Sequence, residues 1–205
     1  MTNEALTRWN ERFSAPGYLF GTAPNRFLAS AKHLLVPGQR ALAVADGEGR
    51  NGVWLAQQGL AVTSVDFSPV ALAKARQLAE QSGVAIETIE ADLAGWEWPS
   101  AAFDVVVAIF VQFAPPPMRA RMFAGMKAAL KPRGLLILEG YRPEQVDYGT
   151  GGPPNREHMY TKELLETSFA DMEILHLKEY DAVIEEGSGH NGRSALIDLI
   201  ARKGV

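Results

Sequence analysis

The sequence predicts an α/β fold: one doubly wound domain with a seven-stranded, mostly parallel sheet whose last strand is antiparallel. Two observations carry this prediction. Short apolar runs alternate with helix-like segments along most of the chain, which is typical of a parallel sheet covered by helices. Two strand-like runs near the end then follow each other with no room for a crossover helix, so they are most simply antiparallel.

The individual elements follow from local signals. Five strands are expected at residues 41–45, 61–65, 86–89, 103–109 and 135–139, and helices at 51–58, 69–82 and 117–130. Ser68 is a good helix cap, Pro69 suits a first helical position, and Gly83 is a typical helix stop. Residues 131–134, Lys-Pro-Arg-Gly, predict a turn into the fifth strand.

The end of the chain breaks the alternation. A helix is expected at 163–169, followed by strands at 172–184 and 194–202 that are joined by "EEGSGHNG". The loop from Gly140 to His158 is long for a compact domain, and such loops are usually functional or mobile. We expect a single domain over residues 1–205, with a possible substrate lid at 140–160.

Composition narrows the class of protein. The chain has 205 residues, a net charge of −4 and no long run of Lys or Arg, so a nucleic-acid partner is not expected. It has no cysteine, which excludes disulfides and a Cys nucleophile. The first residues do not resemble a signal peptide and no apolar run is long enough to span a membrane, so we expect a cytoplasmic protein without a membrane partner.

The first strand leads into Gly47-Glu-Gly49-Arg-Asn-Gly52, a literal G-x-G-x-x-G. Taken alone, this spacing is typical of a dinucleotide site. Asp66 lies 19 residues after Gly47, at the end of the second strand. A carboxylate there accepts hydrogen bonds from ribose hydroxyls, whichever nucleotide carries the ribose.

Three features favour a cationic nucleoside over a diphosphate. Asp46 and Glu48 would place two negative charges against a diphosphate at this helix N-terminus. Asp92, at the third strand end, is placed to accept from an adenine amino group. No Tyr is followed four residues later by Lys, and no second domain is present for a reductase substrate. Alternatively, Asp46 and Glu48 are acids of the kind that favour the first turn of any helix.

These motifs together resemble the class I S-adenosylmethionine-dependent methyltransferases, which have a Rossmann-like fold, and in particular the small bacterial tellurite-resistance-type enzymes. "ALAVADGEGRN" is similar to the family's first motif and "VTSVDFSPVALAKARQLA" to its second. "IEADL", "FDVVVAIFVQF" and "ALKPRGLLILEG" resemble the motifs of the next three strands. "WNERFSAPGYLFGTAPNRFL" resembles the segment that closes over the cofactor, which implies an N-terminal helical cap at residues 1–35.

The resemblance implies S-adenosyl-L-methionine as cofactor, S-adenosyl-L-homocysteine as product, and a set of cofactor-binding residues. Gly47 and Gly49 let the backbone approach the methionine moiety, Asp66 holds the ribose, and Asp92 and Leu93 meet the adenine. The full implied set is Trp9, Tyr18, Gly21, Asp46, Gly47, Glu48, Gly49, Asn51, Asp66, Phe67, Asp92, Leu93 and Phe110. For Trp9, Phe13, Tyr18 and Phe20 the alternative is a core stripe under an N-terminal helix.

Two departures from the family pattern stand in the first motif. Ala43 replaces the family's acid, and Ala45 replaces its first glycine. Alanine is tolerable at position 45 if its φ is negative. We hypothesise that Asp46 partly replaces the lost carboxylate, and we interpret Gly52 as a helix residue that permits close packing.

No catalytic residue can be assigned from the sequence; the weak candidates are His190, Tyr141 and Glu139. For His190 the favoured alternative is an exposed histidine in the turn between the last two strands. Arg142, Gln145, His158 and Tyr160 are further candidates for acceptor binding, whereas His33 and His176 have structural interpretations. The four histidines lack metal-ligand spacing, so no metal is expected. In "GTGGPPN" a flexible hinge is favoured over an oxyanion cradle.

The function predicted from the sequence is S-adenosylmethionine-dependent, in-line methyl transfer to a small-molecule acceptor by a monomer or homodimer. The alternatives are an NAD(P)-binding reductase and a non-catalytic nucleotide-binding protein.

Overall fold

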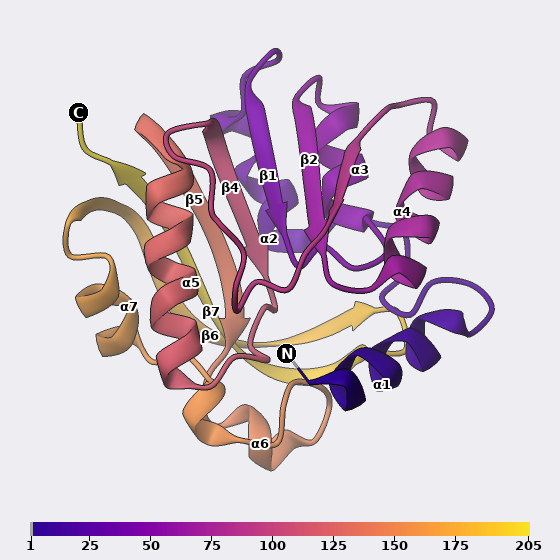
Figure 1. Cartoon of the computed structure of the whole chain (residues 1–205). Helices are drawn as coiled ribbons and strands as arrows, with labels where there is room; N and C mark the ends of the chain where they lie inside the picture. The colour runs from indigo at the N-terminus through magenta and orange to yellow at the C-terminus, as the bar shows by residue number, and fades with distance from the viewer. Residues whose placement is uncertain (1) are drawn as a thin grey trace. The chain divides into compact units, whose positions relative to one another are not determined.

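The computed structural model describes residues 2–205, which form two compact units. The first unit comprises residues up to 97 together with 186–189, and the second comprises 98–185 and 190–205. Both units carry part of the expected α/β alternation (Figure 1).

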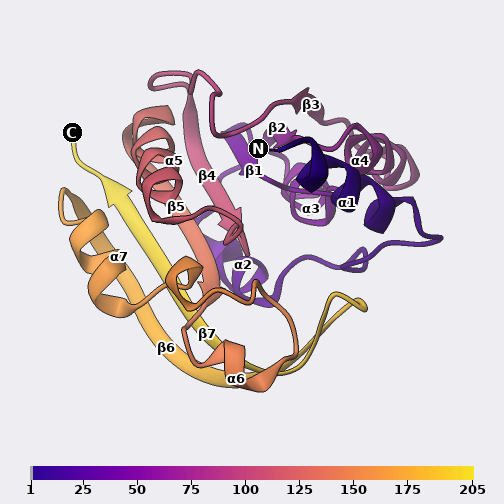
Figure 2. The same ribbon diagram turned by 60° about the horizontal axis from the view of Figure 1, so that its bottom comes forward.

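The first unit is a three-stranded parallel sheet with helices. Its elements are α1 (Asn3–Ser14), α2 (Arg26–Ser30), η1 (Ala31–Leu34), β1 (Arg40–Val44), α3 (Arg50–Gln57), β2 (Ala61–Asp66), α4 (Pro69–Gln81) and β3 (Glu87–Glu90). β2 pairs in parallel with β1 on one side and with β3 on the other. Figure 2 shows α1 lying beside α4, which it contacts.

Local chemistry explains where α4 begins. The Ser68 hydroxyl oxygen accepts the N–H of Ala71 at 3.1 Å, and Pro69 occupies the first helical position. This confirms the predicted cap. The boundaries predicted for the strands of this unit differ from the observed ones by one residue, because the last strand residue depends on pairing and not on local sequence.

The second unit contains the other four strands. Its elements are β4 (Phe103–Ile109), α5 (Pro116–Ala129), β5 (Leu130–Tyr141), α6 (Gln145–Tyr148), η2 (Arg156–His158), α7 (Lys162–Ser168), β6 (Met172–Glu186) and β7 (His190–Lys203). β5 pairs in parallel with β4 and antiparallel with β7. The strand order is β4-β5-β7-β6, and α5 lies along β4 and β5 (Figure 1).

The seven strands form the predicted mostly parallel sheet with the last strand antiparallel. β4 and β5 are deeply buried strands, with Val105, Val106, Leu136, Ile137 and Leu138 fully enclosed. Apolar runs buried on both faces are characteristic of central parallel strands.

One expectation for the second unit is wrong. Residues 131–134 do not end in a separate turn: they belong to β5, where Leu130 pairs with Phe103 and Leu135 pairs with Val105. The surplus residues bulge out of the strand, and Arg133 takes a φ of 64° there. The long segment after β5 contains α6 and η2.

Candidate functional site

The glycine loop between β1 and α3 contains three residues with left-handed backbone. Ala45 has a φ of 48°, Gly47 of 58° and Gly49 of 87°. Alanine is therefore not at a negative φ, and its Cβ makes this conformation costly by roughly 1–2 kcal/mol. The chain nevertheless reverses sharply after β1, so the surrounding structure must hold Ala45 in place.

Gly49 is required by the packing of α4. A Cβ at this position would lie 2.6 Å from the Cβ of Ala75. The glycine thus lets α4 approach the loop at the point where α3 begins.

Asp66, the last residue of β2, holds the loop from one side. Its Oδ2 accepts the N–H of Gly47 at 2.9 Å, and its Oδ1 accepts the N–H of Ser68 at 2.9 Å. Only 4% of Asp66 is exposed. Burial raises the pKa of its carboxyl group to about 6, and the N–H donors of Ser68, Gly47 and Phe67 limit that rise.

Asp46 holds the loop from the other side. Its Oδ2 accepts the N–H of Gly52 at 3.1 Å and the hydroxyl of Ser64 at 3.0 Å. A Cβ on Gly52 would lie 2.4 Å from this oxygen, which confirms that residue 52 permits close packing. The carboxyl group lies deep in the protein. Burial raises its pKa to about 7, the bonds from Ser64 and Gly52 oppose the rise, and Asp66 adds to it.

Glu48 fastens the amino-terminal segment to the loop. Its Oε1 lies 2.8 Å from Lys74 Nζ, and its Oε2 accepts the N–H of Leu19 at 2.7 Å. Lys74 also donates to the carbonyl oxygens of Ala15 and Gly17. The negative charge of Glu48 is therefore already compensated by a lysine.

An aromatic cluster from the amino-terminal segment lies at the loop. The rings of Trp9 and Phe13 stack with centroids 5.3 Å apart, and Phe20 lies 6.4 Å from Phe13. Phe13 is buried, and its ring would be 3.5 Å from a Cβ on Gly47. Phe13 fits the core-stripe interpretation, whereas Trp9 and Phe20 remain partly exposed.

Tyr18 and Gly21 lie in the same segment. The Tyr18 ring is 5.7 Å from Lys74 Nζ, and its buried hydroxyl oxygen has no hydrogen-bond partner among the described residues. Burial, followed by the nearby Glu48, raises the pKa of this phenol. Gly21 has a φ of 72° and lies against Gly187 of the hairpin tip.

A buried polar network surrounds Glu186, a residue that the sequence interpretation missed. Its carboxylate forms an ion pair of 2.6 Å with Arg50 and accepts from the side chain of Asn25 at 3.1 Å. Asn51, predicted to bind cofactor, accepts the N–H of Asn25 at 2.9 Å. Glu186 lies 136 residues from Arg50 in sequence, so no local pattern could have paired them.

The predicted adenine-side residues lie at the carboxyl ends of β2 and β3. Phe67 is partly buried and Leu93 is buried. Asp92 is exposed, and its Oδ1 accepts the N–H of Ala94 at 2.9 Å. The carboxyl ends of parallel strands are where ligands bind in open α/β sheets.

The second unit brings Phe110, Tyr141 and His190 together. Phe110, which follows β4, has a φ of 55° and stacks on Tyr141 with centroids 4.6 Å apart. Its ring also meets the edge of His190 at 4.4 Å. His190 is 9% exposed, so the interpretation of this residue as an exposed turn histidine is wrong: β7 begins at His190 and the ring is packed between aromatic side chains.

Glu139 lies two residues before Tyr141 on β5. It faces Asp198 across β5 and β7, and Tyr180 donates a hydrogen bond of 3.3 Å to its Oε1. Both carboxyl groups are buried. Burial raises the pKa of Asp198 to about 6, and hydrogen bonds from Tyr180 and Glu139 oppose this.

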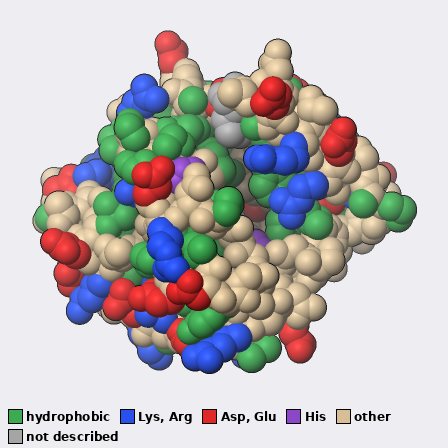
Figure 3. Space-filling model, turned by 90° about the horizontal axis from the view of Figure 1, so that it is seen from below, with side chains coloured by type: hydrophobic (Ala, Val, Ile, Leu, Met, Phe, Trp, Pro, Cys, Tyr) green, Lys and Arg blue, Asp and Glu red, His purple; other side chains and the backbone are tan. Residues whose placement is uncertain are grey.

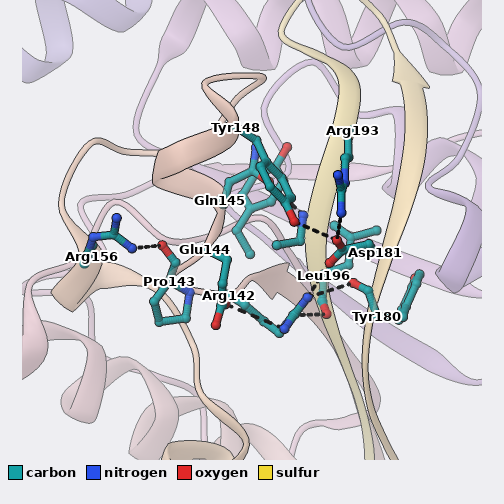
Figure 4. A network of polar contacts seen from close by, with 12 residues as sticks. Arg142, Pro143, Glu144, Gln145, Tyr148, Arg156, Tyr180, Asp181, Arg193 and Leu196 are labelled. Atoms are coloured by element: carbon teal, nitrogen blue, oxygen red, sulfur yellow. Dashed lines mark hydrogen bonds and ion pairs between the residues drawn. The ribbon is translucent and has the colours of Figure 1, made fainter.

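The loop after β5 is fastened by ion pairs (Figure 4). Arg142, Tyr148 and Arg193 all donate to the carboxylate of Asp181, the last two at 2.6 and 2.8 Å. The hydrogen bond from Tyr148, followed by that from Arg193, lowers the pKa of Asp181. Gln145 is fully buried and accepts the N–H of Ala195 at 2.9 Å.

The remaining histidines and Tyr160 lie apart from the Asp181 cluster. Tyr160 is buried against Phe123, and His158 is partly buried in η2. His33 is exposed and lies 3.1 Å from the Ser30 carbonyl oxygen; burial lowers the pKa of His176 on β6. Within residues 2–205, no group of three or more His, Cys, Asp or Glu side chains could hold a metal ion.

Part of the chain, including the glycine loop, matches a known family model. Residues 41–134 match the family model described as "Methyltransferase domain". The matched residues run from β1 into β5 and include the glycine loop. No helix among the described residues is long and apolar enough to cross a membrane.

One relative of this chain has a name that includes its acceptor. A phosphatidylethanolamine N-methyltransferase of Cereibacter sphaeroides is 34% identical over 125 residues, which is 58% of this chain and 60% of the relative. The match thus spans less than two thirds of that relative's length.

Solved structures share the fold at low identity. TehB of Haemophilus influenzae has a TM-score of 0.70 at 20% identity, covering 86% of this chain and 61% of TehB. The N-methyltransferase NodS of Bradyrhizobium japonicum, solved with S-adenosyl-L-homocysteine, has a TM-score of 0.74 at 12% identity, covering 98% of this chain and 99% of NodS.

Proposed function

We propose that this protein transfers a methyl group from S-adenosylmethionine to a small-molecule acceptor. The observation that carries the proposal is the glycine loop: left-handed residues between β1 and α3, held from both sides by the carboxylates of Asp66 and Asp46. This loop lies within the residues that match the methyltransferase model.

The side chains around the loop fit the proposed cofactor. Carboxylates accept hydrogen bonds from ribose hydroxyls and attract positive charge, whereas a diphosphate would be repelled by them. The buried hydroxyl of Tyr18, which has no partner among the described residues, is a donor suited to an amino-acid carboxylate. This donor set supports S-adenosylmethionine over a nicotinamide dinucleotide.

The chain's own residues then have distinct roles in the proposal. Asp66 binds the ribose, Phe67, Asp92 and Leu93 contact the adenine, and the backbone of Gly47 and Gly49 approaches the methionine moiety. The weaker contacts proposed are those of Trp9, Tyr18, Gly21, Asn51 and Phe110. Glu48 acts indirectly, because its carboxylate holds Lys74 and Leu19.

Methyl transfer needs little covalent help from the protein. When bound, S-adenosylmethionine supplies an electrophilic methyl group on a positively charged sulfur. The protein aligns the nucleophile within about 3–3.5 Å of the carbon and excludes water. A base is needed only for an acceptor that must lose a proton, and His190, Tyr141 and Glu139 are the groups proposed to supply it.

The acceptor is proposed to be small. The names of the Cereibacter and Bradyrhizobium relatives describe N-methyltransferases, which makes amines the first acceptors to test. On the face shown in Figure 3, Lys and Arg side chains lie among Asp and Glu. This mixture of charges favours a small acceptor over a polyanion. The segment 140–160 is proposed as the substrate lid, and the protein as a monomer or homodimer.

Ligand-dependent melting tests the cofactor, and an acceptor panel tests the reaction. S-adenosylmethionine and S-adenosylhomocysteine should raise the melting temperature, whereas NADH should not. Asp66→Ala should weaken the binding of S-adenosylmethionine and S-adenosylhomocysteine by about 100-fold, because the loop and the ribose lose a charged acceptor. Asp171→Asn, an exposed residue paired with Lys127, is the control.

Each other outcome names a different function. Stabilisation by NADH alone would replace the proposal with a reductase. Binding of S-adenosylmethionine without production of S-adenosylhomocysteine, over amines, thiols, phenols and oxyanions, would indicate a non-catalytic binding protein.

A further inference from the structure

Asp46 is chemically unusual among the loop's acids because its charge has no ion-pair partner among residues 2–205. Glu48 is paired with Lys74, and Glu186 is paired with Arg50. Asp46 instead receives two neutral donors, the Gly52 N–H at 3.1 Å and the Ser64 hydroxyl at 3.0 Å.

An ionised carboxylate at position 46 costs free energy of folding. Its carboxyl group is enclosed by protein, and the neighbouring charge of Asp66 disfavours ionisation. The charge of Arg50 favours the ionised form of Asp46, but Arg50 already forms an ion pair with Glu186. An asparagine of the same shape would avoid the desolvation of a charge, so packing alone does not explain an acid here.

The position of Asp46 supplies a reason. It is the second residue of the loop that includes Gly47 and Gly49, and its carboxylate fixes the third residue of α3 through Gly52. A negative charge at this loop favours a ligand whose own charge is positive. The proposed cofactor carries such a charge on sulfur, and its demethylated product does not.

We propose that Asp46 is a specificity-determining residue that makes the loop prefer the sulfonium cofactor over its neutral thioether product. Its ionised carboxylate balances the positive sulfur electrostatically, and its bonds to Gly52 and Ser64 keep that charge in place. This inference rests on the proposed function, because it presupposes that the loop binds S-adenosylmethionine. The consequence is chemical: the enzyme binds its substrate form and releases its product form from the same site.

The pH dependence follows with a definite sign. The pKa of Asp46 is about 7 in the folded chain, against an ordinary value of 3.8, so folding favours its protonated form. The stability contributed by protonated Asp46 is present below pH 4 and is lost as pH rises through 7. Binding of the positively charged cofactor, in contrast, favours the ionised form of Asp46. Affinity for S-adenosylmethionine should therefore rise between pH 6 and pH 8, and binding at pH 7 should release roughly half a proton.

Calorimetry of Asp46→Asn tests the proposal. We titrate wild type and variant with S-adenosylmethionine and with S-adenosylhomocysteine at pH 6, 7 and 8, in buffers of different ionisation enthalpy. In the variant, the preference for S-adenosylmethionine over S-adenosylhomocysteine should fall on the order of tenfold at pH 8, and the proton release should disappear. A merely structural role would weaken both ligands equally and leave their ratio unchanged.

Glu48→Gln is the matched control, because it removes a loop charge that Lys74 already compensates. It should retain the ligand ratio of the wild type. Ser64→Ala removes a hydrogen bond that favours the ionised form of Asp46, so it should move the rise in affinity to higher pH. A ratio that falls equally in Glu48→Gln would overturn the assignment to Asp46.

The remaining outcomes separate the two proposals. If the wild type binds neither ligand, the proposed function fails. If it binds both with equal proton release and no change of their ratio with pH, the proposed function stands and the role of Asp46 is refuted. This comparison uses the wild type alone, so it decides the matter even if Asp46→Asn does not fold.

Discussion

The polar networks around Glu186 in the first unit and Asp181 in the second have similar chemistry and opposite surroundings. Each is a carboxylate that receives an arginine and other donors. The Arg50–Glu186 side chains are 8% and 6% exposed, whereas the side chain of Asp181 is 30% exposed and that of Arg193 is 66% exposed. Both carboxylates accept from an arginine and from two further donors, but water screens those of Asp181.

The difference teaches that the number of contacts is a poor guide to their importance. In a buried pair, removing one partner leaves the other charge without solvent, which is strongly destabilising. In an exposed network, water replaces the lost partner at little cost. We therefore expect Glu186 to determine the stability of the loop region and Asp181 to have a smaller effect on the segment after β5.

Glu186→Gln should have the largest effect. The guanidinium of Arg50 would remain buried without a counter-charge, while the shape of the side chain and its bond from Asn25 are kept. We expect the free energy of unfolding to fall by about 3–5 kcal/mol, measured by urea denaturation. The matched control is Glu166→Gln, whose exposed pair with Lys162 should contribute little. Equal losses in both variants would contradict the comparison.

Ala45→Gly should have an intermediate effect with the opposite sign. The φ of 48° is costly for alanine and not for glycine. Denaturation should show a gain of roughly 1 kcal/mol, reduced by the greater entropy of glycine in the unfolded chain. Gly83→Ala, at a φ of 67° with open space around it, should lose stability for the same reason. A loss of stability in Ala45→Gly would show that the loop does not strain the alanine.

Asp181→Asn should have the smallest effect. Arg142 would keep its hydrogen bond of 3.1 Å to the Leu196 carbonyl oxygen, and Arg193 would keep its position 4.7 Å above the Tyr148 ring. We expect a change below about 1 kcal/mol, smaller still in 0.5 M salt. Hydrogen exchange of the segment 142–156 would detect any local opening. A loss as large as that of Glu186→Gln would mean that the network acts as a buried one.

Much of the fold could be predicted from local signals. The cap at Ser68, the alternation of apolar runs and the closing antiparallel pair are all visible in short stretches of sequence, and the structure confirms them. The turn at residues 131–134 was misplaced because pairing with β4 extends β5 through it as a bulge. The strand propensity of residues 131–134 alone cannot predict this extension of β5, since strand pairing depends on two segments.

The candidate site was likewise predicted only in part. Residue type and spacing were sufficient to select Asp46, Asp66 and the glycines, because they occupy consecutive strand ends. The aromatic packing of His190 and the role of Glu186 were not accessible, because their partners lie far away in the chain.

The sequence by itself determined the order of strands and helices, the positions of the loop glycines and the acids around the loop. Only the tertiary structure decided which of those acids are neutralised. Lys74 reaches Glu48 and Arg50 is taken by Glu186, whereas Asp46 is left with neutral donors. The physical reason is that charge compensation depends on distance and burial, which are set by packing between distant segments and not by the local pattern.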